Sequence, residues 1–320
     1  MKVVPFVKDD DILEPISNSQ SGATVLKVIR GDKNFFLKIM DGDLSFLTKI
    51  KKIIWIYAQY TSKPMLLLDS GIVSNQVYCI YSWIEGSALN HLYDEYSNEQ
   101  FYTYGVRIGK YFNRINQNIP KEEQFEKKYD LSLLTHTSIA NFMEFFTKNE
   151  KAISSIFSRD EINHIIDRIL VLQNSFMETE KVYIHGDLHP KNVMINREEE
   201  LTIIDCESFC IDYFVMNFRW NLASIFKTRS VAYFYSGLIK GFYKENPPTS
   251  LYNQLLYILL LKFLEQTYSY TKIKPLDFIL QYMEQYKVAL DCVSIEKDNH
   301  NFLDDETVFE KCQKMQYKKV

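Results

Sequence analysis

Two aspartates and one asparagine lie close together in the middle of the sequence. Asp187 and Asn192 are five residues apart, and Asp205 follows thirteen residues after Asn192. The apolar runs Val193–Ile195 and Leu201–Ile204 predict a short β-hairpin that returns Asp205 beside the loop. In phosphoryl transfer, one carboxylate accepts a hydroxyl proton, while an amide oxygen and a second carboxylate hold Mg²⁺ against nucleotide phosphates. The spacing therefore indicates phosphoryl-transfer chemistry.

The first 80 residues predict the strands that would position these groups. A β-branched, apolar run and a second apolar run flank the turn Gly31-Asp32, which favours a hairpin. A stretch with helical periodicity and two further strand-like runs follow. The expected ranges are 24–29, 34–40, 44–60, 65–71 and 76–81.

The chain becomes mainly helical after Gly86. One β interlude, Val182–Asp205, interrupts the helical part, and helix is expected to resume about a dozen residues after Asp205. A strand-rich first part and a helical second part predict an α+β, bilobal architecture. We expect an N-lobe at 1–82, a hinge at 83–87 and a C-lobe at 88–320; the helical ranges are 98–116, 138–149, 159–178 and several stretches from 217 onward.

Length, composition and charge are typical of a globular protein. The chain has 320 residues, of which 46% are hydrophobic and 24% charged. Its net charge of −4 argues against a nucleic-acid binder, which usually carries a basic face. Residues 84–320 carry 27 Lys and Arg against 33 Asp and Glu. This excess suits a cationic ligand, and a solvated acidic face would show the same count.

Cysteine usage and apolar runs bear on the compartment. Five cysteines, with no Cys-x-x-Cys pair, argue against a disulfide framework or a zinc site. Pro5 and early charges interrupt any secretory signal, and the longest apolar run, Leu255–Leu261, is too short to cross a bilayer. We expect a cytoplasmic monomer or homodimer without nucleic-acid or membrane partners.

The segment His185–Asn192 resembles the catalytic loop of the aminoglycoside-phosphotransferase and choline-kinase superfamily. The likeness runs from about Leu13 to Tyr270. It implies a protein-kinase-like fold, with Asp187 as catalytic base and with Asn192 and Asp205 as ligands of Mg²⁺. His185 would organise the loop.

The same resemblance assigns the nucleotide site, with ATP or GTP as the phosphate donor. Lys38, in Phe36-Leu37-Lys38-Ile39, is similar to the lysine that pairs with the α- and β-phosphates. Ser21 and Gly22 lie in a segment that resembles the nucleotide-positioning loop. Tyr81–Gly86 resembles the hinge, where the Ser82 carbonyl and the Ile84 amide would bind adenine.

The sequence departs from the family pattern at several positions. Members usually carry a glutamate in the N-lobe helix that pairs with the lysine, and no Glu occurs between Lys38 and Trp83. Gln59 is one replacement, and phosphate alone could otherwise hold Lys38. The helix after the hinge often ends in Leu-His, but this chain has Ile115-Asn116. Asp212 fits the family's Gly-Asp-Pro, although its neighbours do not, and we interpret it as a helix-capping or loop-bracing residue.

The sequence says least about the acceptor, the molecule whose hydroxyl would receive the phosphate. The segment 217–221 and the segment 235–242 resemble poorly characterised bacterial members, which names no substrate. Acidic and aromatic residues of the later helices are candidates for its pocket: Glu265, Tyr268, Tyr270 and Asp277. An antibiotic-like, cationic acceptor is the preferred reading, and a housekeeping amino alcohol, choline or sugar is the alternative. A non-catalytic kinase-like protein is a third reading. No Ala-Pro-Glu-like ending follows Asp205, which argues against a protein kinase.

Overall fold

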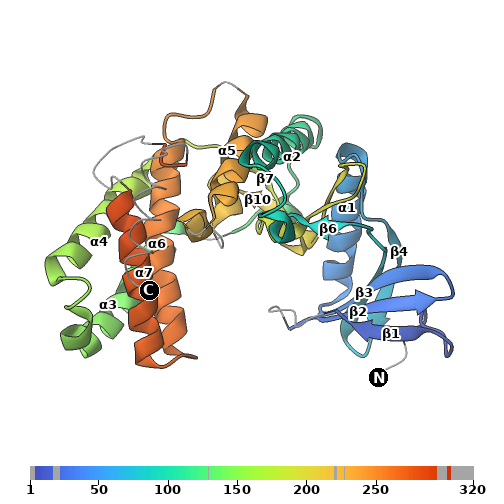
Figure 1. The fold of residues 1–320 in the computed structure, drawn as a ribbon, viewed down its shortest axis with the longest axis horizontal. Helices are drawn as coiled ribbons and strands as arrows, with labels where there is room; N and C mark the ends of the chain where they lie inside the picture. Colours follow the sequence, from blue (N-terminus) through green and yellow to red (C-terminus); the bar gives the residue numbers. More distant parts are fainter. Residues whose placement is uncertain are drawn as a thin grey trace. The chain divides into compact units, whose positions relative to one another are not determined.

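A five-stranded antiparallel sheet forms the first part of the chain in the computed structural model, with the strand order β1-β2-β3-β5-β4 (Figure 1). Its hairpin β2–β3 and the neighbouring strands confirm the predicted strand-rich N-lobe. The strands are β1 Ile12–Pro15, β2 Thr24–Arg30, β3 Lys33–Asp41, β4 Leu67–Val73 and β5 Gln76–Ser82.

The structure describes residues 4–16, 22–128, 130–219, 222–226, 228–244, 246–293 and 301–303. The chain divides into a first unit, Met1–Leu92 with Pro190–Phe209, and a second unit, Tyr93–His189 with Cys210–Val320. Each unit is described by itself. The lobe boundaries expected from the sequence stay a prediction.

Burial explains why the sheet of the first unit is stable. Leu26 and Val28 of β2 alternate with less buried residues, and together with Leu37 and Ile80 they form an apolar core. Helix α1, Leu44–Tyr60, begins where Asp43 accepts the N–H of Phe46, and it matches its predicted range. Its isoleucines are buried, as the helical period requires.

A small second sheet of the first unit carries the predicted hairpin. Strand β8, Val193–Ile195, pairs with β9, Leu201–Ile203, and also with β6, Ser87–Ala88. Gly86 has a φ of +127°, and a Cβ there would lie 2.1 Å from the Ile195 carbonyl oxygen. Short 3₁₀ turns flank these strands: η1 Leu89–Leu92, η4 Pro190–Asn192 and η5 Cys206–Ser208.

Two helices of the second unit, α2 Asn98–Asn118 and α5 Arg229–Tyr243, pack along each other (Figure 1). Glycines spaced four residues apart on both helices make their contact close. A Cβ on Gly105 would lie 2.1 Å from the Phe234 carbonyl oxygen, and a Cβ on Gly237 would lie equally close to that of Tyr102. Glycine at these positions therefore allows backbone-to-backbone packing.

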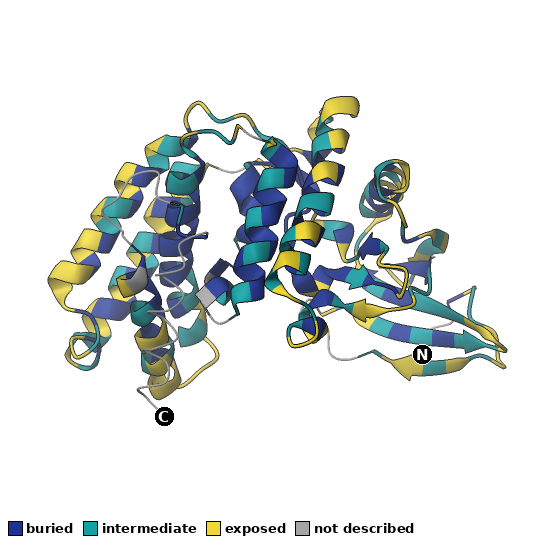
Figure 2. Cartoon of the chain, turned by 45° about the horizontal axis from the view of Figure 1, so that its top comes forward, coloured by how far each residue is buried: buried dark blue, intermediate teal, exposed yellow. Residues whose placement is uncertain are grey.

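The remaining helices pack around α6, Leu251–Thr271, whose residues are mostly buried. Figure 2 shows buried and exposed faces along the helices, as expected of amphipathic packing. Helix α3 is longer than predicted, because Asp130 caps an earlier start, and α4 is shorter, because a 3₁₀ turn ends it. The ranges are α3 Leu131–Ile153, α4 Arg159–Gln173, α7 Leu276–Cys292, η2 Glu123–Phe125 and η3 Asn174–Phe176.

The segment after Asp205 differs from its prediction. Among the described residues, the next α-helix begins only at Arg229, and 3₁₀ turns η6 Phe214–Phe218 and η7 Leu222–Phe226 precede it. Strand β10, Cys210–Asp212, also forms there and pairs with β7, Val182–Ile184. Three-residue strands and 3₁₀ turns leave too little periodicity to be recognised from sequence. No helix in the described ranges is long and apolar enough to cross a membrane.

Candidate active site

Lys38 lies on the central strand β3, opposite Cys79 of β5. Its side chain is only 8% exposed, and its ammonium lies 2.7 Å from Asp205 Oδ1 and 3.0 Å from Glu207 Oε1. Burial alone would lower the pKa of Lys38, but the charges of Glu207 and Asp205 outweigh it and raise that pKa. Lys38 is therefore a fixed cation held by two carboxylates.

Glu207 supplies a carboxylate to Lys38 in this chain, whose N-lobe helix has no glutamate. Helix α1 has no acidic residue in its first turn, and Gln59 on its last turn is exposed. The contact with Lys38 comes instead from Glu207 in η5, two residues after Asp205. Sequence reasoning missed this partner, although a second carboxylate next to Asp205 was a visible signal.

Asn192 and Asp205 are brought together by the hairpin β8–β9. Val193 pairs with Ile203, and the Ile204 N–H donates to the Asn192 carbonyl oxygen at 3.0 Å, which extends the pairing to the residue before Asp205. Asp205 has a left-handed backbone, with a φ of +56°. Such a conformation is uncommon outside glycine and is often found at functional sites. The hairpin prediction is confirmed here.

Asp187 belongs to the second unit and follows β7. Gly186 before it has a φ of +82°, which turns the chain sharply. The Asp187 N–H donates to His185 Nδ1 at 3.3 Å, and Asp187 Oδ1 lies 3.7 Å from His189 Nε2. His185 is completely buried, whereas the Asp187 side chain is 35% exposed. The buried imidazole thus shapes the loop, and the carboxylate stays accessible.

Asn217 of η6 contacts this loop, and sequence reasoning, which named it only within the segment 217–221, gave it no role. Its side-chain Oδ1 accepts the N–H groups of His185 at 3.0 Å and of Gly186 at 3.3 Å. Its amide nitrogen donates to the Phe214 carbonyl oxygen at 3.2 Å. The buried amide therefore fixes the backbone immediately before Asp187.

Asn116 stands where the family often has the His of Leu-His. It binds the backbone of Tyr183 through two hydrogen bonds. Its Oδ1 accepts the Tyr183 N–H at 2.7 Å, and its Nδ2 donates to the Tyr183 carbonyl oxygen at 3.0 Å. Helix α2 is thereby joined to β7, the strand that leads into the loop. The predicted brace Asp212 is buried in β10 and accepts the Tyr213 N–H at 2.8 Å.

The residues expected to bind nucleotide lie on the first unit. Ser21 falls outside the described residues, while Gly22 is described and has a φ of +74°. The Ser82 hydroxyl accepts the Leu66 N–H at 3.1 Å, at the end of β5. Ile84 follows β5 and is half-buried. Their roles toward a nucleotide stay predictions.

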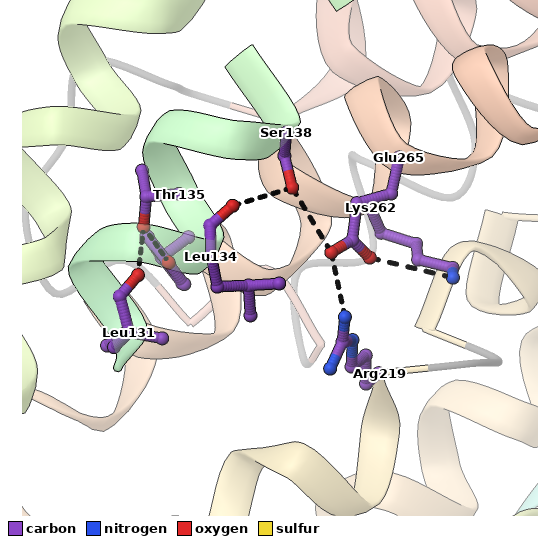
Figure 3. Close-up of polar contacts among 8 residues, drawn as sticks. Leu131, Leu134, Thr135, Ser138, Arg219, Lys262 and Glu265 are labelled. Atoms are coloured by element: carbon purple, nitrogen blue, oxygen red, sulfur yellow. Dashed lines mark hydrogen bonds and ion pairs between the residues drawn. The ribbon is translucent and has the colours of Figure 1, made fainter. Parts of the chain in front are cut away.

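Glu265, a candidate for the acceptor pocket, lies in a polar cluster of the second unit (Figure 3). Its carboxylate is 2.7 Å from Arg219, 3.8 Å from the Lys262 ammonium and 3.4 Å from the Ser138 hydroxyl. Burial, with the nearby charge of Arg219, lowers the pKa of Lys262 to about 8, against the opposing effect of Glu265. Two cations therefore share this carboxylate.

The other pocket candidates show packing roles. The ring of Tyr270 meets Phe278 and Tyr282 edge-on, and the Lys272 ammonium lies over the ring of Tyr268. Asp277 lies in the first turn of α7, where its charge favours the helix dipole. Their part in acceptor binding stays a prediction.

The first unit offers oxygen donors of the type that Mg²⁺ prefers. These are the Asn192 amide and the Asp205 carboxylate, whose side chain is 49% exposed beside Lys38. Two protein ligands are enough for Mg²⁺, which usually keeps waters and binds substrate phosphates. The donor set therefore fits the ion. No cluster of three or more His, Cys, Asp or Glu suited to a metal occurs within the described ranges, and Cys206 is a buried thiol whose pKa is raised by burial.

Comparison with known proteins bears on this arrangement. The fold is similar to that of spectinomycin phosphotransferase APH(9)-Ia, solved with ADP and spectinomycin, at 17% identity and a TM-score of 0.53 over 95% of this chain and 93% of that one. It is also similar to ADP-bound aminoglycoside phosphotransferase APH(2'')-Ib, at 11% identity and a TM-score of 0.59 over 86% and 92%.

A Plasmodium vivax ethanolamine kinase has the same fold, at 13% identity and a TM-score of 0.51 over 91% and 84%. Among curated proteins, none matches this chain. Residues 13–247 match the family described as the phosphotransferase enzyme family (APH). The chain, a small-molecule phosphotransferase with a kinase-like fold, belongs to this family.

Proposed function

We propose that this protein transfers the γ-phosphate of ATP, or of GTP, to a hydroxyl of a small molecule. The observation that carries the proposal is the hairpin β8–β9, which brings Asn192 and Asp205 together while Asp205 contacts Lys38. A cation, a carboxylate and an amide in this arrangement suit a metal-bound triphosphate.

Each residue has a defined task in the proposed reaction. Asp187 accepts the proton of the acceptor hydroxyl, so that its oxygen attacks the γ-phosphorus and the nucleoside diphosphate leaves. Asn192 and Asp205 would hold Mg²⁺, which neutralises phosphate charge when bound. Lys38 donates to the α- and β-phosphates.

Backbone groups complete the proposed nucleotide site. Ser21 and Gly22 lie near the phosphates in this proposal, where small residues let N–H groups approach oxygen. The Ser82 carbonyl and the Ile84 N–H bind the adenine edge.

The preferred acceptor is an antibiotic-like compound with positive charge. Support comes from the acidic excess in residues 84–320 and from the similarity to a spectinomycin phosphotransferase. Resistance to an antibiotic, in the cytoplasm, would be the corresponding role. The acidic excess is not uniform over the second unit, because the cations Arg219 and Lys262 lie beside Glu265.

A housekeeping metabolite is the second candidate acceptor. The similarity to an ethanolamine kinase favours an amino alcohol, which is also a cation. Positive charge is therefore common to an antibiotic-like acceptor and an amino alcohol, whereas a sugar, the other housekeeping acceptor, would be neutral.

A panel assay tests the proposal. The purified protein is given ATP or GTP with Mg²⁺ and antibiotics, amino alcohols or sugars, and release of nucleoside diphosphate is measured. We expect turnover with an amine-bearing acceptor and a KM that rises with added salt. A best substrate that is neutral or anionic, with a salt-independent KM, would overturn the charge argument. Lack of turnover with every acceptor, together with no nucleotide binding, would overturn the phosphotransfer proposal.

A further inference from the structure

The buried ammonium of Lys38 needs a permanent partner that the N-lobe helix does not supply. Helix α1, which follows β3, contains no Asp or Glu, and Gln59 near its end is exposed. A buried cation without a carboxylate is costly, so another element has to provide one.

We infer that Glu207 is the positioning residue of Lys38 and replaces the helix glutamate, so that Asp205 is released for the metal ion. This inference rests on the proposed nucleotide role of Lys38. Glu207 contacts Lys38 at 3.0 Å and is only 16% exposed, whereas Asp205 is 49% exposed. The less exposed carboxylate is suited to a lasting ion pair, and the more exposed one is suited to a ligand.

The surroundings of Glu207 support a structural anchor. Burial, and next the charge of Glu207, raise the pKa of the Tyr81 hydroxyl. That hydroxyl is therefore neutral near pH 7, and among the described residues Lys38 is the cation in contact with Glu207. The side chains of Lys38 and Glu207 are both mostly buried, and a buried ion pair is screened little.

Helix α1 acts on this pair indirectly. The ring of Tyr57 on α1 meets the ring of Phe209 edge-on, with centroids 5.6 Å apart. Phe209 lies two residues after Glu207 and donates its N–H to the Cys206 carbonyl oxygen at 3.0 Å. The helix therefore packs against the turn that carries Glu207, and a charged contact from the helix itself is not needed.

A double-mutant cycle tests the inference, with ADP affinity measured by calorimetry in the presence and absence of Mg²⁺. The variants are Glu207→Gln, Lys38→Met and the combination, and Glu200→Gln is the matched control. Glu200 is also in the first unit and pairs with an exposed lysine, Lys63, at 2.7 Å. In Glu207→Gln, Asp205 becomes the one carboxylate that still contacts Lys38. Lys38 is then less well placed for phosphate, so we expect ADP affinity to fall about 5- to 30-fold.

We expect the effects of Glu207→Gln and Lys38→Met on ADP affinity to be non-additive. The loss caused by Glu207→Gln should vanish in the Lys38→Met background, and Glu200→Gln should match wild type. A loss that persists without Lys38 and shifts the Mg²⁺ requirement would make Glu207 a metal ligand and overturn the inference alone. Absence of ADP binding by the wild-type protein would overturn the proposed function as well. Glu207→Asp, which keeps the charge on a shorter side chain, should recover part of the affinity, and no recovery in a folded variant would also count against the inference.

Discussion

The side chain of Asn217 accepts a hydrogen bond of 3.0 Å from the backbone N–H of His185 and so links η6 to the proposed catalytic loop. A second bond from Gly186 makes this amide a two-point clamp directly before Asp187. The clamp is neutral and buried, so it fixes the loop through geometry and adds no charge.

Asn217→Ala should therefore impair turnover more than nucleotide binding. Two buried N–H groups lose their acceptor, which costs about 1–3 kcal/mol for each unsatisfied group. We expect a lower free energy of unfolding and a kcat reduced more strongly than the KM for ATP is raised. Urea unfolding and steady-state kinetics measure both. Asn113→Ala, which removes one bond to the Phe242 carbonyl oxygen, is the control. Equal kcat in the two variants would contradict the clamp.

Asp187→Asn tests the proposed base. The amide preserves the shape of the side chain but does not accept the hydroxyl proton, a contribution of roughly 10²–10⁴-fold in rate. Acceptor-dependent turnover should fall by that factor, while ATP binding measured by calorimetry stays at the wild-type level. Turnover within a few-fold of wild type would remove Asp187 from the role of base.

Asp205→Asn tests the proposed metal ligand. Asparagine tolerates the left-handed backbone of this position, so the fold should persist. Loss of the charge should remove the gain in ATP affinity that Mg²⁺ gives, about tenfold or more. Calorimetry with and without Mg²⁺ measures this gain. An unchanged ATP affinity at saturating Mg²⁺ would be incompatible with the assignment.

Local sequence patterns predict many of the strands and helices of this fold. They do not predict side-chain contacts between residues far apart in the sequence. The hairpin β2–β3, helix α1 and the hairpin that returns Asp205 follow from alternation, period and turn residues. Glu207 and Asn217 act on partners 169 and 32 residues away in sequence, which no local pattern encodes. The dense apolar residues after Asp205 predict helix, whereas the structure has 3₁₀ turns there, which are too short to show a period of their own.

Gly237→Ala tests the close packing of α2 and α5. The added Cβ would meet the Tyr102 carbonyl oxygen at 2.1 Å, so the helices must separate. Overpacking of this kind costs about 1–3 kcal/mol, more than the gain in helix propensity of roughly 1 kcal/mol. Thermal unfolding should show a lower Tm. Thr103→Ala, on the exposed face of α2, should change stability little, and a Tm for Gly237→Ala at or above wild type would contradict the packing.

Lys262→Met tests the polar cluster around Glu265 through the pH dependence of stability. Burial, and next the charge of Arg219, lower the pKa of Lys262 to about 8 in the folded protein, while in the unfolded chain it stays near 10.5. Between these values the unfolded state binds more protons, so the Lys262 contribution to the free energy of unfolding rises as pH increases from 8 to 10.5. A shift of this size corresponds to an upper limit of about 3 kcal/mol.

Lys262→Met should remove this rise, because methionine has no proton to lose and suits a buried site. Urea unfolding at pH 7, 8, 9 and 10 gives the difference between the variant and wild type, which cancels the titration of other groups. The difference should favour the variant most below pH 8 and shrink toward pH 10. Lys272→Met, at an exposed position directly after α6, should give a difference that does not vary with pH. A pH-independent difference for Lys262→Met as well would show that Lys262 keeps an ordinary pKa beside Glu265 and Arg219.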